Sequence, residues 1–156
     1  MKSDLDLNLN RKTNSEAAIG FQQADVSFSL RNRKAVRRWL ARVAGERGFS
    51  VGDIQYIFCS DEFLLDINRN FLQHDDYTDI ITFDLGEKKG DLCSEIYISI
   101  PRVKENAKSY GVSFYRELHR VMAHGILHLC GLKDKTPKQE KEMRKAEDEA
   151  LLMKDF

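Results

Sequence analysis

The spacing of apolar residues changes several times along this chain, and the order of the changes limits the folds that it can adopt. Val26, Phe28 and Leu30 alternate with serines, a period that predicts a strand. Residues 53–59 (DIQYIFC) predict a second strand. The blocks TDIITFDL and SEIYISI predict two more strands, joined by GEKKGD as a hairpin.

Helical spacing separates and follows these strands. Asn32, Ser60 and Ser113 are predicted helix caps, Pro101 suits a first helical turn, and the last helix is expected at about 137–154. Four helices carry apolar stripes, formed by Val36, Trp39, Leu40 and Val43, by Phe63, Leu64, Ile67 and Phe71, by Leu118, Val121, Met122, Ile126 and Leu129, and by Met143, Ala146, Ala150 and Leu151. The order β-α-β-α-β-β-α-α-α predicts an α/β (α+β) domain, a small mixed four-stranded sheet with about five helices packed on it.

Length and composition favour one soluble domain. The chain has 156 residues, with 42% hydrophobic and 32% charged residues. Residues 1–18 are polar and patternless, which predicts a flexible N-terminal extension before a single domain over 19–156. They contain no apolar core of a secretory signal, and no apolar run approaches a membrane span of about 20 residues. Three scattered cysteines fit a reducing compartment, so we expect a cytoplasmic protein without a membrane partner.

Residues 124–134 (HGILHLCGLKD) contain the strongest chemical signal. His124 and His128 lie one helical turn apart, so their rings can share one metal ion. Gly131 permits a positive φ that ends the helix, and Asp134 then supplies an anionic oxygen. A bare pair of histidines at this spacing recurs by chance, whereas the added glycine and aspartate predict a zinc site at the end of a central helix. His119 lies on another face of this helix, so we expect it at the surface or behind the ligands.

The spacing HxxxHxxGxxD resembles that of zinc proteases of the metzincin type. Those enzymes place a glutamate directly after the first histidine as general base. Gly125 occupies that position here and cannot take a proton. Peptide hydrolysis is therefore the weaker interpretation of this site.

Taken with two upstream blocks, residues 124–134 resemble the YbeY family of bacterial metal-dependent endoribonucleases, whose hallmark resembles HGxLHLxGxDH. Residues 78–83 (TDIITF) resemble the family's TDVLSF, and residues 94–99 (SEIYIS) its GDIxIS strand. The similarity spans about residues 24–150. It implies a zinc-dependent endoribonuclease that cleaves single-stranded RNA, matures the 3′ end of small-subunit ribosomal RNA and acts in ribosome quality control, with the ribosome or small-subunit proteins as partners.

Two positions depart from the family pattern. The family's third ligand is usually histidine, and this chain has Asp134, whose charge would lower the Lewis acidity of a bound ion. The family also carries a tyrosine–arginine pair before TDVLSF, and the matching residues here are Phe71 and Leu72. His74 is our candidate to replace that arginine, with Arg69 as another nearby base.

The remaining candidates concern RNA binding and proton transfer. The helix expected within 31–47 carries seven basic residues against Glu46, and we assign RNA contacts to Arg33, Arg37 and Arg38, although an ordinary solvated face fits the same counts. No general base is evident, but the strand acids Asp79, Asp84 and Glu95 could line the cleft. The alternatives to a nuclease are a non-catalytic, ribosome-associated RNA-binding factor that is stabilised by its metal, and a metzincin-like hydrolase.

Overall fold

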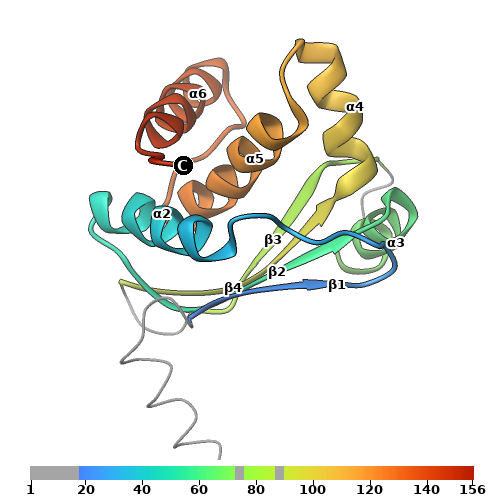
Figure 1. Cartoon of the computed structure of the whole chain (residues 1–156), viewed down its shortest axis with the longest axis horizontal. Coiled ribbons are helices and arrows are strands. Elements are labelled where there is room, and N and C mark those ends of the chain that lie inside the picture. Colours follow the sequence, from blue (N-terminus) through green and yellow to red (C-terminus); the bar gives the residue numbers. More distant parts are fainter. Residues whose placement is uncertain (1–17, 73–75, 87–89) are drawn as a thin grey trace, which may run out of the picture.

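The computed structural model describes residues 18–72, 76–86 and 90–156, and it has a four-stranded mixed sheet at its centre (Figure 1). The strand order is β1-β2-β4-β3, in which β1 and β4 both run parallel to β2. Strand β3 is antiparallel to β4, as expected for a hairpin. The strands are β1 (Ile19–Gln23), β2 (Ser50–Cys59), β3 (Ile80–Asp84) and β4 (Asp91–Ser99). The predicted mixed sheet is confirmed.

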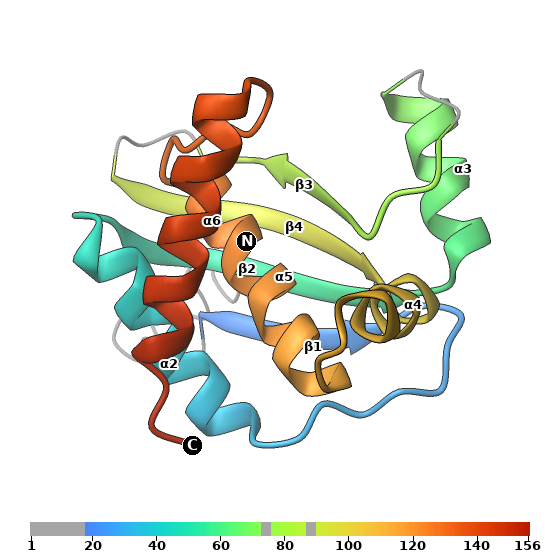
Figure 2. The same cartoon turned by 90° about the horizontal axis from the view of Figure 1, so that it is seen from above.

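Four helices cover one face of this sheet (Figures 1 and 2). They are α2 (Arg33–Glu46), α4 (Ile100–Tyr110), α5 (Phe114–Leu129) and α6 (Pro137–Leu152). The main core lies between them and the sheet, where α5 contributes buried residues such as Leu118, Met122 and Ile126. Among the described residues, none of these helices is both long and apolar enough to cross a bilayer.

The opposite face of the sheet carries a smaller core under α3 (Asp61–Phe71). Successive strand residues point to opposite faces, so Ile96 joins the main core while Tyr97 joins the second. Leu64 of α3 packs there with Ile81 and Cys59. The five helices that the structure describes therefore divide unequally, four on one face and one on the other.

Local signals placed most helix starts correctly. The hydroxyls of Ser60 and Ser113 each accept a hydrogen bond from the backbone N–H three residues later, as predicted for caps. Pro101 lies in the first turn of α4. Asn32 is different, because it adopts a left-handed φ of 58° and its side chain makes no capping hydrogen bond.

Two predictions about strand and helix faces were wrong. Residues 26–30 form no strand, and the first strand is Ile19–Gln23, which pairs with β2. Val26, Phe28 and Leu30 alternate because the segment crosses one edge of the core and buries every second side chain. Phe71 was expected on the inner face of α3, but 71% of it is exposed, because the last turn passes beyond the small core.

Candidate metal centre and its cavity

Helix α5 lies unusually close to the sheet at Gly125. A Cβ atom at this position would come within 3.2 Å of the Cδ1 atoms of Ile80 and Ile96. Position 125 therefore faces the sheet, while His124 and His128 line a cavity on another side of the helix. Any side chain at 125 would have to displace Ile80 and Ile96. The absence of a protease-type general base thus has a steric reason as well as a chemical one.

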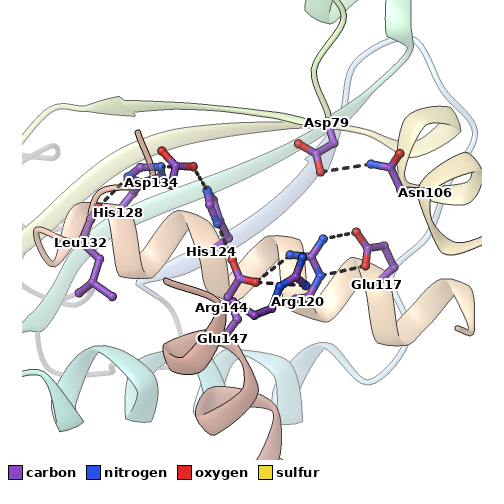
Figure 3. Close-up of polar contacts among 10 residues, drawn as sticks. All are labelled: Asp79, Asn106, Glu117, Arg120, His124, His128, Leu132, Asp134, Arg144 and Glu147. Atoms are coloured by element: carbon purple, nitrogen blue, oxygen red, sulfur yellow. Dashed lines mark hydrogen bonds and ion pairs between the residues drawn. The ribbon is translucent and has the colours of Figure 1, made fainter. Parts of the chain in front are cut away.

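The turn after α5 brings a carboxylate back to the histidines. Gly131 has a φ of 102°, which confirms the predicted positive φ, and the N–H of Leu132 donates to the carbonyl of Leu127 at 3.1 Å. The same turn aims the Leu132 carbonyl at Nδ1 of His128, 2.9 Å away (Figure 3). With Nδ1 donating to this carbonyl, Nε2 of His128 is left as the acceptor atom that faces Asp134.

Three side-chain atoms then converge. Asp134 Oδ2 lies 3.4 Å from Nε2 of His124 and 3.5 Å from Nε2 of His128, and the three possible ligand atoms lie within 4.8 Å of one another. Tetrahedral zinc with bonds of about 2.0–2.1 Å separates its ligand atoms by about 3.3 Å. The residues present therefore fit a small divalent ion with little rearrangement.

Glu147 is the residue of this site that the sequence analysis missed. It is only 2% exposed, and its Oε2 lies 2.6 Å from Nδ1 of His124 (Figure 3). A signal was available, because Glu147 falls on the inward stripe of α6 beside Met143 and Ala150. An acid on an apolar helix face needs a partner, since a buried unpaired charge is costly.

Arg120 supplies the second partner of Glu147. Its Nη1 donates to Glu147 Oε1 at 2.7 Å, and its other nitrogens donate to both oxygens of Glu117. Burial alone would raise the pKa of Glu147, but the hydrogen bonds and charges of His124 and Arg120 hold this pKa below its ordinary value. Glu147 is therefore an ionised carboxylate held rigidly behind His124.

The cavity in front of the three side chains has a volume of about 930 Å³. It lies between α5, β3 and the N-terminal half of α6. Asp79 and Asp84 line it, as predicted for the cleft, whereas Glu95 is exposed and is not among the described lining residues. Burial raises the pKa of Asp79, whose Oδ2 accepts a hydrogen bond from Asn106 at 3.5 Å.

The other predicted site residues lie elsewhere. Arg33, Arg37 and Arg38 are on α2, and none of them is among the described lining residues of the cavity. His74 lies outside the described residues. His119 was expected at the surface or behind the ligands, and this was wrong, since it is 4% exposed in an aromatic cluster away from His124. The helix period correctly predicted that His119 faces away from the other two histidines. The sequence alone could not show which residues bury it.

Comparison with known proteins decides the family. A family model for "Endoribonuclease YbeY" matches residues 18–154. The chain belongs to the YbeY endoribonuclease family. The resemblance inferred from the sequence blocks is thereby confirmed, and the matched region is longer at both ends.

Individual relatives agree with this placement. The YbeY endoribonuclease of Cytophaga hutchinsonii is 50% identical over 90% of this chain and 99% of its own length. That of Porphyromonas gingivalis is 48% identical over 88% of this chain and 90% of its own. The solution structure of TM1509 from Thermotoga maritima superposes with a TM-score of 0.53 at 26% identity, over 85% of this chain and 88% of that one. The YbeY family thus accounts for nearly all of the described chain, and it supports an endoribonuclease role in ribosomal RNA processing.

Proposed function

We propose that this chain cleaves single-stranded RNA with one zinc ion held by His124, His128 and Asp134. Its substrate is the 3′ end of small-subunit ribosomal RNA, in the cytoplasm and beside small-subunit proteins, where it also serves ribosome quality control. The observation that carries the proposal is the convergence of these three side chains on a polar cavity in a member of an endoribonuclease family. The cavity supplies the room that an RNA phosphate needs next to the ion.

A zinc ion in this site would polarise a phosphoryl oxygen and acidify a bound water. The protein's own part is to hold the ligands in place. Glu147 accepts the Nδ1 proton of His124, and the Leu132 carbonyl accepts that of His128, so both rings present Nε2 to the cavity. Asp134 adds a negative charge between them, which lowers the net charge of the loaded site.

Asp79 is the best-placed group for proton transfer in the cavity. It lies on the β3 side, across from α5, as Figure 3 shows. Its raised pKa makes it a better proton carrier near neutral pH than an ordinary exposed aspartate. Asn106 donates a hydrogen bond of 3.5 Å to one of its oxygens and so helps to position the carboxylate.

The test combines metal analysis with RNA cleavage. We expect the purified protein to contain one equivalent of zinc and to cleave an unstructured RNA faster than the same sequence in a duplex. His124→Ala should lose both the metal and the cleavage, because one of three ligands is gone. Exposed Lys145→Ala on α6 is the matched control and should keep both.

Two outcomes contradict the proposal. Metal-dependent cleavage that persists in His124→Ala would show that the active site lies elsewhere. RNA binding without turnover, together with unfolding when the metal is chelated, would favour the alternative of a non-catalytic ribosome-associated factor whose fold is stabilised by its metal ion. Robust turnover of a peptide substrate would revive the hydrolase alternative.

A further inference from the structure

The cavity at the metal centre continues past Arg120. A second hollow of about 250 Å³ borders it, and both are lined by Tyr110, Arg120 and Arg144. We call the two together the α6 groove. Its α5 wall runs from His128 to Arg116, which are 12 positions apart and therefore separated by about 18 Å of helix. That length accommodates more than one nucleotide, since bases along one strand of a duplex lie about 3.4 Å apart.

The α6 wall of this groove carries two cations that are open to a ligand near the metal centre. Lys141 is exposed, and the Arg144 side chain is 54% exposed with one ion pair of 3.7 Å to Glu147. Arg120 also lines the groove but is held by Glu117 and Glu147, as Figure 3 shows. Long, exposed cationic side chains beside a reaction site are the usual contacts of RNA phosphates.

Acidic groups line the groove on both walls. Asp79 and Asp84 lie on the β3 side of the cavity, where they would repel a phosphate backbone. Glu140 also lines the cavity and lies beside Lys141 on α6. Asp148 of α6 lines the second hollow as well. The β3 wall differs in that its described lining residues include acids and no cation, so a strand at the metal centre is directed toward the two exposed cations of α6.

Tyr110 offers an aromatic surface at the shared part of the groove. It ends α4, is 55% exposed, and lines both hollows. The Arg120 guanidinium lies 5.8 Å from its ring centroid, so one side of the ring is supported by a fixed cation. A base that stacks on such a ring must be unpaired, and stacking contributes about 1–3 kcal/mol per base.

The arginines of α2 are engaged differently. Arg37 Nε donates to the Ile19 carbonyl at 2.8 Å and its guanidinium lies 5.2 Å from the centroid of the Phe21 ring. Arg33 Nε donates to the Leu30 carbonyl at 3.4 Å. Arg37 therefore joins α2 to β1, while Arg33 bonds to the chain just before its own helix, and neither belongs to the described lining of the groove.

We propose that the RNA strand leaves the metal centre along the α6 groove, with its phosphates on Lys141 and Arg144 and an unpaired base on Tyr110. This inference rests on the proposed function, because it assigns the substrate path of the same site. It also gives a physical basis for single-strand preference, since a duplex cannot present a base face to Tyr110.

The experiment measures binding of a fluorescent 2′-O-methyl single-stranded RNA to the zinc-loaded protein over a range of salt concentrations. Lys141→Ala/Arg144→Ala should weaken binding and lower the slope of log K against log salt by about 1.4, or 0.7 for each lost phosphate contact. Lys138→Ala/Lys145→Ala removes the same charge from the outer side of α6 and should leave the slope unchanged. Lys141→Ala alone, which leaves the Arg144–Glu147 pair intact, should lower the slope by about 0.7.

A second arm tests the stacking contact. Tyr110→Ala should weaken binding about 5- to 150-fold, and Tyr110→Phe should retain it, because a phenyl ring offers the same face. The salt slope should stay at the wild-type value in both variants, since neither removes a phosphate contact.

The outcomes separate this inference from the proposed function. If the wild type cleaves RNA but the Lys141/Arg144 variant binds like its control, the groove is wrong and the function stands. If the slope falls only in Arg33→Ala/Arg38→Ala, α2 is the phosphate-binding face and the groove is again wrong. If the groove variants lose binding as expected but the wild type never cleaves RNA, the groove stands and the proposed nuclease function fails.

Discussion

His119 and His124 lie five residues apart on one helix, and their surroundings give them opposite chemistry. Nδ1 of His124 meets the carboxylate of Glu147, whereas Nδ1 of His119 accepts a hydrogen bond of 2.7 Å from the ammonium of Lys154. Burial, with the charges of Lys154 and Arg31, lowers the pKa of His119 to about 4. A carboxylate behind a histidine favours a cation in front of it, and an ammonium disfavours one. The neighbours of each ring, more than its place on α5, decide whether it can bind metal.

The largest expected effect is the loss of zinc affinity when a histidine ligand is removed. His124→Ala should weaken zinc binding by roughly 3–4 kcal/mol, since four-ligand structural sites yield about 10–16 kcal/mol in total. This is a loss of several hundredfold in affinity, measured by competition with a chelator. His119→Phe should bind zinc as the wild type does. Equal losses in the two variants would mean that the two histidine environments are not distinct.

The second expected effect is a pH dependence of the free energy of unfolding that comes from His119. Between pH 6.5 and about 4 the unfolded chain protonates this histidine and the folded chain does not, so the free energy of unfolding falls as the pH is lowered. The shift of about 2.5 pKa units corresponds to at most about 3 kcal/mol. Denaturant unfolding at several pH values measures it.

His119→Phe is the control for this pH dependence. Subtracting its unfolding free energies from those of the wild type, at equal zinc loading, removes the contribution of the acidic groups common to both. The difference should vary between pH 4 and 6.5 and be flat above pH 7. A difference that is flat throughout would contradict the lowered pKa of His119.

The smallest effect tests the carboxylate behind His124. Glu147→Gln should weaken zinc binding about 10- to 100-fold, because the amide holds Nδ1 less strongly and no longer favours the cation. Glu149→Gln, exposed on the same helix, should leave the affinity unchanged. The Nδ1–H resonance of His124, followed by NMR in the metal-free protein, should be lost or shifted in Glu147→Gln only. An unchanged affinity would remove Glu147 from the account of the site.

Periodic segments were predictable, and contacts between distant segments were not. The stripe of Met143, Ala146, Ala150 and Leu151 gave α6 its inner face, and all four are buried. The same stripe contains Glu147, but its role depends on α6 meeting α5 across 23 residues, which no local pattern encodes. Residues 26–30 show that a local pattern can also mislead. Their alternation predicted a strand, but the same alternation arises where an irregular segment crosses the edge of the core.

The convergence of the three candidate ligands was largely predictable because these residues are close in the sequence. His124, His128 and Asp134 fall within 11 residues, and the helix period and the Gly131 turn determine their separation. The cavity was less predictable. Asp79 was one of three equivalent acids. It directly precedes β3 and lines the cavity, whereas Glu95 of β4 pairs with Phe83 on the side of the small core.

The contact of Gly125 with Ile80 and Ile96 limits how this scaffold can evolve. A single substitution to glutamate would complete the HExxH signature of a zinc protease, yet its Cβ would press on the Cδ1 atoms of Ile80 and Ile96, which would have to shift. A route to peptide hydrolysis would first have to open the packing between α5 and the sheet, at the expense of folding. The packing of α5 on the sheet therefore favours a residue without a side chain at the position where a zinc protease carries its general base.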